Sequence, residues 1–258
     1  MKNYNKMEKL KLKFKNIWEK EVLKILDYES KKMDFKILNL PKKDLVKRAP
    51  LLIEKITKNQ FKNKISKCQL AFFSGANGVG KNTIMTEVMK KIKAKKLPYA
   101  YTRARRSDEI DRIDYYFWDD KKFDKTLKEK KFLWYDLNHH GKKQGLLKKD
   151  FNNFINRKEK FVLDARVLTT KFLLEKVPKI KNSNYISFYI LPPSFDEWYR
   201  RLTNRSQSFP SEDVIERIEI SLKELAKAKK ICEVFIVNNK VKRAVKEILK
   251  FYTLKERL

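Results

Sequence analysis

A glycine-containing loop between an apolar run and a helical stretch restricts the fold of this chain more than any other feature. The run LAFFS leads into GANGVGKNT, and the helical pattern TIMTEVMKKI continues from there. Gly75, Gly80 and Lys81 match the pattern GxxxxGK in its required strand, loop and helix context. Glycines let backbone N–H groups converge on phosphate oxygens, and the helix N-terminus adds partial positive charge. We predict a nucleotide-phosphate site, the alternative being a degenerate loop kept for packing.

One position of this loop departs from the pattern. The residue after the lysine is ordinarily Ser or Thr, whose hydroxyl binds Mg²⁺, but this chain has Asn82 there and Thr83 one place later. An amide oxygen can bind Mg²⁺, although it is bulkier and has a different reach. Asn82 is therefore the candidate metal ligand, with weaker or rearranged Mg²⁺ binding expected. The candidate nucleotide-binding residues of the loop are Gly75, Gly78, Gly80, Lys81, Asn82 and Thr83.

Short apolar runs that alternate with helical stretches follow along the chain. They lie at 70–73, 161–163, 185–191 and 234–237, with a plausible fifth at 97–101. Continuous apolar strands separated by helices indicate a parallel sheet that is covered on both faces. Ser194 and Glu197 have the spacing of a capping box, and a closing helix follows the last run. We therefore predict an α/β fold with a parallel five-stranded sheet flanked by helices.

The first 66 residues differ from the rest and contain no catalytic pattern. Apolar residues from Leu10 to Leu26 recur at helical spacing between Lys and Glu, which predicts an amphipathic helix. A second helical stretch runs from about Leu45 to Ile56, and Pro50 predicts an interruption inside it. The apolar stripe must pack on the main domain or on a partner protein. We assign 1–66 as a Lys-rich helical extension and 67–258 as the main domain.

The composition is strongly basic but does not by itself indicate nucleic-acid binding. The 258 residues include 63 Lys and Arg against 32 Asp and Glu, giving a formal net charge of +31. Only 13 of these basic residues are Arg, the residue that specific phosphate and base recognition favours. The lysines are spread along the whole chain, which is typical of a compositional bias. We therefore do not expect a nucleic-acid partner.

Other classes of protein are also disfavoured. Apolar residues make up 42% of the chain, which is too many for a disordered basic tail. No stretch approaches the ~20 uncharged apolar residues of a membrane helix, and the N-terminus has no signal-peptide pattern. We expect a cytoplasmic protein without a membrane span. Cys68 and Cys232 cannot form a disulfide framework and lack zinc spacing, so we expect buried, reduced thiols.

From about residue 68 to residue 253 the chain resembles the guanylate kinase family. The loop GANGVGKNT resembles the family's GPSGVGKST, and TRARRSDEIDRIDYYF resembles TRxxRxxExDGxDYxF. Arg103, Arg106 and Tyr115 fall on the residues that hold the acceptor phosphate in the family, and LDARV resembles LDIDxQG and keeps Asp164. The alternative for the arginine segment is a solvated basic loop. The resemblance implies a P-loop NTPase fold, ATP as phosphoryl donor, a nucleoside monophosphate as acceptor and Mg²⁺ as cofactor.

Two segments nearer the C-terminus extend the resemblance. LPPSFDEWYRRLTNR and the later ERI resemble the lid segment PPSxEELxxRLxxRG…xRRL, with one extra residue before the last arginine. Arg201, Arg205 and Arg217 thus match lid arginines, and with Lys81 they are the candidate catalytic residues, because phosphoryl transfer needs positioning and charge neutralisation. IVNNK resembles VVNDD, which implies that Asn238 lies near the donor adenine. The resemblance also implies a nucleoside monophosphate-binding region at about 99–158 and a lid at about 195–230.

The residues that read guanine in the family are not kept. The family uses a Glu in FxEW, a Tyr and a Ser or Thr in NYYGT, a Ser ahead of TTR and the second Asp of LDID. At these positions this chain has, in the same order, Trp134, Gln144, Leu146, Tyr99 and Arg166. Guanine selectivity is therefore not supported.

The stretch around this altered pocket leaves one alternative open. A slip of two residues in the alignment would let Asp136 take the role of the missing Glu. His139 and His140 follow closely, and we expect them to face solvent because no third metal ligand is near in sequence.

Two functional hypotheses follow from these residues. The first is ATP-dependent phosphoryl transfer to a nucleoside monophosphate, with altered acceptor choice. The second is a catalytically weak or inactive guanylate-kinase-like subunit of a larger protein complex, motivated by Asn82, the altered base pocket and the N-terminal helices. Because the phosphate residues are kept while the base readers are lost, we favour the enzyme. The sequence fixes neither the acceptor base nor the oligomeric state.

Overall fold

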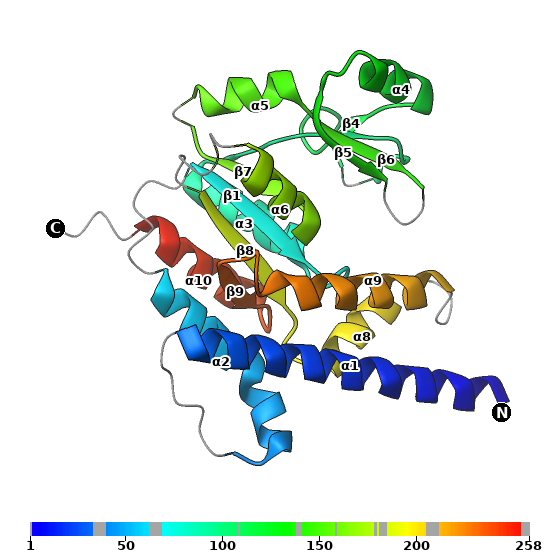
Figure 1. The fold of residues 1–258 in the computed structure, drawn as a ribbon, viewed down its shortest axis with the longest axis vertical. Coiled ribbons are helices and arrows are strands. Elements are labelled where there is room, and N and C mark those ends of the chain that lie inside the picture. The colour runs from blue at the N-terminus through cyan, green and yellow to red at the C-terminus, as the bar shows by residue number, and fades with distance from the viewer. Residues whose placement is uncertain are drawn as a thin grey trace.

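The computed structural model describes residues 2–32, 40–61, 69–107, 109–137, 141–157, 159–177, 180, 185–204 and 212–253. These ranges form a central sheet, a second, smaller sheet and the helices around them (Figure 1). None of the helices in these ranges combines the length and the apolar character that crossing a membrane requires.

The central sheet has five strands, all parallel, in the order β2, β7, β1, β8, β9. Their bounds are Lys95–Lys96, Phe161–Asp164, Leu70–Gly75, Tyr185–Leu191 and Val234–Val237. Side chains of the last four are buried along nearly their whole length, because helices cover both faces. The predicted α/β fold with a parallel five-stranded sheet is confirmed.

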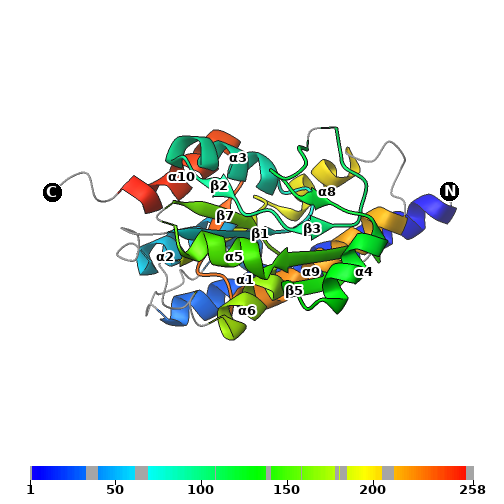
Figure 2. The same cartoon turned by 90° about the horizontal axis from the view of Figure 1, so that it is seen from above.

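Helices lie on both sides of this sheet (Figure 2). One side carries α3 (Lys81–Ile92) and α10 (Val241–Thr253), which pack against each other. The other side carries α1 (Lys2–Lys32), α2 (Lys42–Gln60), α6 (Val167–Lys176) and α9 (Glu212–Ala228). The short helix α8 (Phe195–Thr203) follows β8.

The fifth strand of the central sheet is not the one that we predicted. The run 97–101 was expected to supply it, but the strand is β2, and the ladder ends where Leu97 N donates to Val162 O at 2.8 Å. Pro98 follows immediately and has no N–H to continue the ladder. The chain therefore leaves the central sheet, and Ala100–Tyr101 joins the second sheet as β3.

The second sheet has four strands in the order β4, β3, β6, β5. Besides β3, its strands are Tyr116–Phe117 (β4), Lys143–Leu147 (β6) and Phe132–Leu137 (β5). It carries α4 (Asp120–Lys128) and α5 (Lys148–Ile155), and it lies at one end of the central sheet (Figure 1). The space between the two sheets is where the candidate site forms.

The amphipathic helix predicted near the N-terminus is present as α1. Its apolar stripe is buried, with Phe14, Trp18 and Val22 each at most 3% exposed. The stripe packs on α2, α9 and α8 and belongs to the same core cluster as the central sheet. The stripe is thus covered by the chain's own main body.

The second predicted helix is continuous, so the interruption expected at Pro50 is wrong. Helix α2 runs from Lys42 to Gln60 with Pro50 inside it. A proline in a helix interior costs about 3 kcal/mol, but Ala49, Ile53 and Ile56 on the same helix are fully buried against the main body. Tertiary packing of this face outweighs the local cost.

Side chains of α2 cover the open edge of the central sheet at β9. Thr57 Oγ1 accepts from Phe235 N at 3.1 Å, and Glu54 Oε2 accepts from Val237 N at 2.7 Å. Edge N–H groups that are left unpaired invite association with other chains. Glu54 is itself 1% exposed and paired with Arg243 at 2.6 Å. Helix α2 therefore covers the edge of the sheet at β9.

Two smaller predictions can also be checked. Ser194 accepts from Glu197 N at 3.2 Å and caps α8, whereas the Glu197 side chain binds Arg200 and Arg201 instead of completing the box. Cys232 is a buried free thiol, and burial raises its pKa, which makes it unreactive. Cys68 lies outside the described residues.

Candidate functional site

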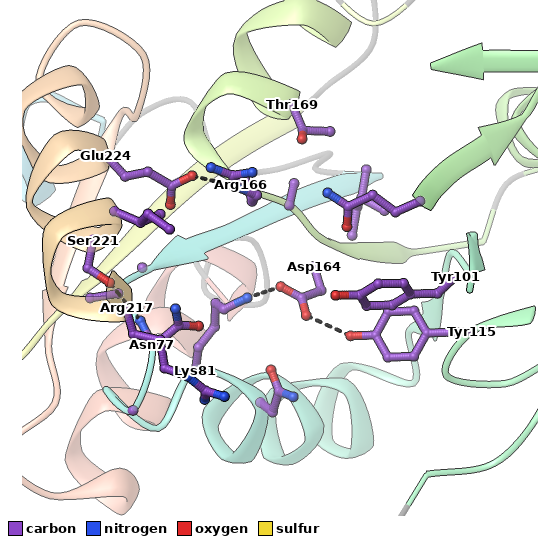
Figure 3. Close-up of a pocket in the computed structure, with 18 of the residues that line it drawn as sticks. Asn77, Lys81, Tyr101, Tyr115, Asp164, Arg166, Thr169, Arg217, Ser221 and Glu224 are labelled. Atoms are coloured by element: carbon purple, nitrogen blue, oxygen red, sulfur yellow. Dashed lines mark hydrogen bonds and ion pairs between the residues drawn. The ribbon is translucent and has the colours of Figure 1, made fainter. Parts of the chain in front are cut away.

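A cavity of about 430 Å³ lies where β1 and β7 end and the second sheet begins. Ligands of open parallel sheets bind at the carboxyl ends of strands, and Gly75 and Asp164 are the last residues of these two strands. Helices α6 and α9 and the loop before α3 complete the walls (Figure 3). All six predicted loop residues line the cavity, namely Gly75, Gly78, Gly80, Lys81, Asn82 and Thr83.

The glycines of the loop before α3 are required by its geometry. Gly78 and Gly80 have φ values of 77° and 84°, which disfavour other residues. A Cβ at Gly78 would lie 2.8 Å from a methyl carbon of Leu202, and one at Gly80 would lie 2.5 Å from the Asn238 amide nitrogen. The loop therefore has the tight shape that brings backbone N–H groups toward a phosphate.

Side chains from three other elements hold this loop in place. Trp198 Nε1 donates to Asn77 O at 2.7 Å, and Ser221 Oγ accepts from Asn77 N at 3.3 Å. Asn238 Nδ2 donates to Val79 O at 2.6 Å. These contacts from α8, α9 and the end of β9 fix the backbone of the loop before any ligand binds.

Lys81 lies at the centre of the cavity against a carboxylate. Its ammonium group pairs with Asp164 Oδ1, and Asp164 Oδ2 accepts from Tyr115 Oη at 2.9 Å (Figure 3). Burial lowers the pKa of Lys81 to about 8, an effect that Glu224 opposes and Lys96 reinforces. The ammonium form therefore predominates at neutral pH. Asp164 links the loop to the side of the cavity that carries Tyr115.

Arg103 is fixed on that same side. Its guanidinium group forms a two-pronged pair with Glu109, with Nη1 to Oε2 at 2.7 Å, and stacks 4.8 Å from the ring centre of Tyr101. Arg106 also lines the cavity, and its backbone N donates to Glu109 at 2.9 Å. Glu109 thus orders the segment that contains both predicted arginines.

Helix α9 supplies the opposite wall. Arg217, Ser221 and Glu224 lie on one face of α9 and line the cavity (Figure 3). Glu224 Oε1 accepts from Arg166 Nε at 2.7 Å, which connects α9 to the end of β7. The structure therefore brings Arg217 into the same cavity as Lys81, Arg103 and Arg106.

Two predicted residues engage the loop backbone rather than the cavity. Arg201 donates to Asn238 O at 3.0 Å and to Val79 O at 3.4 Å, and its Nε contacts Glu197. Asn238 is 3% exposed, and its Oδ1 has no hydrogen-bond partner among the described residues. Arg205 lies outside the described residues.

The end of the cavity away from the loop is aromatic. Tyr99 and Trp134 are each 8% exposed, and their ring centres lie 6.2 Å apart at an angle of 89°. Leu146 and Gln144, at 1% and 4% exposed, lie beside them on β6. Gln144 Nε2 has no hydrogen-bond partner in the described part of the chain. We refer to Tyr99, Trp134, Gln144 and Leu146 as the base end.

Asp136, the alternative left open in sequence, lies opposite Gln144 on the neighbouring strand β5 but is not among the residues that line the cavity. The Asp136 side chain is 44% exposed and lies 3.7 Å from Arg166, outside the cavity lining. His139 and His140 lie outside the described residues. Trp134, not Asp136, is the β5 residue that lines the cavity, and this agrees with the alignment without a slip.

The cavity suits Mg²⁺ only in company with phosphate oxygens. No group of three or more His, Cys, Asp or Glu that could hold a metal occurs in the ranges that the structure describes. Asn82 and Thr83 are exposed at the start of α3 and line the cavity. Mg²⁺ commonly keeps several waters and takes few protein ligands beside substrate phosphates. The oxygens of Asn82 and Thr83 fit that limited role.

Sequence reasoning missed several residues of the site. Glu224 and Ser221 were not singled out, although their spacing from Arg217 places all three on one helical face. Lys96 was also missed, and its ammonium group contacts Asp114 at 3.0 Å and lies 3.9 Å from the ring centre of Tyr115. The position of Lys96 directly before the apolar run 97–101 was the sequence signal that could have identified it.

Comparison with known proteins agrees with this architecture. The family model "Guanylate kinase" matches residues 67–254. Guanylate kinase from Mycoplasmopsis synoviae is 30% identical over 186 residues, covering 70% of this chain and 92% of the relative. Guanylate kinase from Thermus thermophilus is 29% identical over 189 residues, covering 73% of this chain and 82% of the relative.

A solved structure agrees as well. The crystal structure of guanylate kinase from Anaplasma phagocytophilum superposes with a TM-score of 0.54 at 17% identity, covering 72% of this chain and 85% of that one. At this identity the structure supports the fold alone, while the family model spans the glycine loop, the arginine segment and α9. The chain with this cavity, preceded by two additional helices, therefore belongs to the guanylate kinase family.

Proposed function

We propose that this protein transfers the terminal phosphoryl group of ATP to a nucleoside monophosphate, with Mg²⁺ as cofactor. The observation that carries the proposal is the chain of contacts from Lys81 through Asp164 to Tyr115, which joins the glycine loop to the arginine side of one cavity. A donor phosphate at the loop and an acceptor phosphate at the arginines would meet near Lys81. Family membership supports this reaction type.

The donor side of the reaction falls to the loop and the residues around it. Lys81 and Arg217 neutralise the transferring phosphoryl group, and backbone N–H groups of the loop bind the donor phosphates. Arg201 and Arg205 join them by the family resemblance, and Arg201 also contacts the loop through Val79 O. The family resemblance assigns Asn238 a place near the donor adenine, and its Nδ2 holds the loop by donating to Val79 O at 2.6 Å.

The acceptor side falls to the segment after β3. Arg103 and Arg106 bind the acceptor phosphate, because guanidinium groups give two-pronged hydrogen bonds to phosphate oxygens. Tyr115 and Asp164 orient that phosphate relative to Lys81. Residues 99–158 form the acceptor region, 195–230 the lid, and 1–66 an extension of the main domain at 67–258.

Magnesium supplies charge neutralisation between the phosphates when it is bound. Asn82 is the protein ligand that we assign to it, with the phosphate oxygens and water as the others. The base end differs from the guanine-reading motif, so we expect an acceptor choice that differs from that of a typical family member.

A coupled assay of ADP release tests the proposed function. The intact protein is incubated with ATP, Mg²⁺ and each common ribo- or deoxynucleoside monophosphate in turn. We expect ADP release that depends on at least one monophosphate and on Mg²⁺. Absence of release above the ATP-only background with every nucleotide would contradict the proposal.

The alternative is a guanylate-kinase-like subunit of a larger complex. Asn82 and the altered base end motivate it, but the apolar stripe of α1 is buried on the chain's own body. Light scattering of the intact chain during size-exclusion chromatography separates the two. A monodisperse species with full turnover argues against the subunit, whereas a folded protein that binds no nucleotide supports it.

A further inference from the structure

The base end holds one buried polar group whose role the fold does not explain. Gln144 is 4% exposed, lines the cavity, and its Nε2 has no hydrogen-bond partner among the described residues. Leaving a buried donor unpaired is destabilising, so such a group indicates a ligand that supplies the acceptor. The register of β6 with β3 and β5 holds Gln144 opposite Tyr101 and Asp136.

The alternation of β6 gives this amide a fixed direction. Gly145 faces away from the cavity, because a Cβ there would lie 2.7 Å from Phe132 Cδ1 and 3.2 Å from Phe123 Cζ. Its neighbours Gln144 and Leu146 face the opposite side, as successive side chains of a strand do, and both line the cavity. Gln144 is therefore aimed at whatever flat group enters between the aromatic side chains.

The walls beside Gln144 favour a planar ring and offer no uncommitted carboxylate to an amino group among the described lining residues. Tyr99 and Trp134 present aromatic rings, and Leu146 presents a methyl surface. The carboxylates among the described lining residues are Asp164 and Glu224. Asp136, opposite Gln144 on β5, is outside that lining and lies 3.7 Å from Arg166. Asp164 is engaged by Lys81 and Tyr115, and Glu224 is engaged by Arg166. No uncommitted carboxylate in this described lining is available to accept from an exocyclic amino group.

The common bases differ in whether they carry an exocyclic amino group, which needs a hydrogen-bond acceptor from the cavity. Adenine, cytosine and guanine each carry an exocyclic amino group, whereas thymine carries two carbonyls and a methyl group, and uracil differs only in lacking that methyl. A side-chain amide is complementary to the edge of a dioxopyrimidine, because Nε2 donates to a ring carbonyl while Oε1 accepts from the ring N–H. Guanine can pair with the same amide, but its exocyclic amino group then finds no uncommitted carboxylate among the described lining residues.

We propose that the acceptor is a nucleoside monophosphate of a 2,4-dioxopyrimidine, uracil or thymine, and that Gln144 is the residue that selects it. The kinetic test of this inference rests on the proposed phosphoryl transfer, whereas the binding test does not require turnover. A donor without an acceptor partner in the empty site is satisfied when the ring carbonyl occupies it. The phosphate of the same ligand then extends toward Arg103 and Tyr115, which line the cavity.

Kinetics and calorimetry with the full chain test this proposal together. ATP-dependent turnover is measured with UMP, dTMP, CMP, AMP and GMP, and binding of each monophosphate is measured by isothermal titration calorimetry. We expect kcat/KM and affinity for UMP or dTMP to exceed those for the three amino-bearing bases by about 10- to 100-fold. A preference for GMP, CMP or AMP would overturn the proposal and leave the proposed phosphoryl transfer standing.

Variants of Gln144 test the residue itself. Gln144→Glu replaces the donor by an acceptor of the same length, so we expect the UMP to GMP ratio of kcat/KM to fall by about tenfold or more. Gln144→Leu removes both groups and should weaken UMP without improving GMP. Asn152→Asp, which makes the same charge change at an exposed position of α5, is the matched control.

The outcomes separate the inference from the function on which it rests. An unchanged ratio in Gln144→Glu, with the variant folded by circular dichroism, would overturn the role of Gln144. Tight UMP or dTMP binding without any turnover would remove the phosphoryl transfer but keep the binding specificity. Absence of binding and turnover with every monophosphate would overturn both.

Discussion

The two ends of the cavity differ in how their polar groups are satisfied. At the phosphate end, Lys81 lies against Asp164, and Arg103 lies against Glu109, so these cations are already paired in the empty site. At the base end, aromatic rings surround Gln144, whose Nε2 is without a hydrogen-bond partner among the described residues. Under the proposed function, the phosphate end, made of Lys81, Arg103 and their partners, would bind through charges that every nucleotide shares, and the base end would discriminate through a few neutral groups. Changes at the two ends should therefore affect different kinetic quantities.

The largest expected effect is at the phosphate end, with Lys81→Ala. Removing one preorganised group that stabilises transition-state charge lowers kcat by about 10²- to 10³-fold. Acceptor preference should stay unchanged, because Lys81 pairs with Asp164 and not with a residue of the base end. Steady-state kinetics with each active monophosphate measure both quantities.

Lys90→Ala is the matched control for this substitution. Lys90 lies on the same helix, is exposed, and pairs only at the surface with Glu87 at 2.9 Å. Exposed pairs of this kind contribute at most about 1 kcal/mol, so its kcat should match that of the unmodified protein. A Lys81→Ala variant that keeps kcat within about tenfold would contradict the central role of this lysine.

The second prediction concerns the acceptor phosphate. Arg103→Gln removes charge-assisted hydrogen bonds worth about 1.5–3 kcal/mol, so KM for the monophosphate should rise by about 10- to 100-fold. KM for ATP should change much less. Arg112→Gln in the same segment is the control, since the Arg112 side chain is 83% exposed and its Nε lies 3.7 Å from the Asp111 carboxylate. Equal increases in both KM values would show a general loss of structure instead.

Sequence reasoning predicted four strands of the central sheet but missed the edge strand β2 and the side chains that cover β9. Apolar runs identified β1, β7, β8 and β9 because both faces of these strands are buried. The edge strand β2 consists of Lys95 and Lys96 and has no apolar pattern, so only its pairing with β7 defines it. The cover of β9 by Glu54 was equally invisible, because a glutamate in a Lys-rich helix normally faces solvent.

In the candidate site, too, residues within motifs were predicted, whereas contacts between residues far apart in sequence were not. Motif residues at the phosphate end converge because loop and strand ends have a fixed geometry, and Lys81, Arg103 and Asp164 meet in one cavity as that predicts. Arg201 contacts the backbone carbonyls of Val79 and Asn238, a pairing that its motif did not predict, and its action on the phosphoryl group stays a prediction. The partner of Arg166 could not be predicted, because Glu224 lies 58 residues away and no local pattern connects them.

The third prediction uses the pH dependence of the phosphate end. Burial lowers the pKa of Lys81 to about 8, so the ammonium form that binds phosphate is present below that pH and lost above it. Since kcat/KM reports ionisations of the free enzyme, it should be level near pH 7 and fall by about tenfold per pH unit well above 8. Lys81→Arg keeps its charge and should abolish this decline. A decline that persists in Lys81→Arg would belong to another group.

The smallest expected effect is that of Asn82→Ser, which tests whether the two ends are independent. The substitution supplies the hydroxyl that the loop pattern ordinarily offers to Mg²⁺, and it should raise apparent Mg²⁺ affinity and turnover by about two- to tenfold. Titration of turnover against Mg²⁺ measures both. A loss of affinity would instead identify the Asn82 amide as an adapted ligand.

The ratio of kcat/KM between monophosphates should not change in Asn82→Ser, because Asn82 lies at the start of α3 and the base end is formed by the second sheet. A shift in that ratio would mean that metal and base binding are coupled through the cavity, and the separation between its ends would no longer hold.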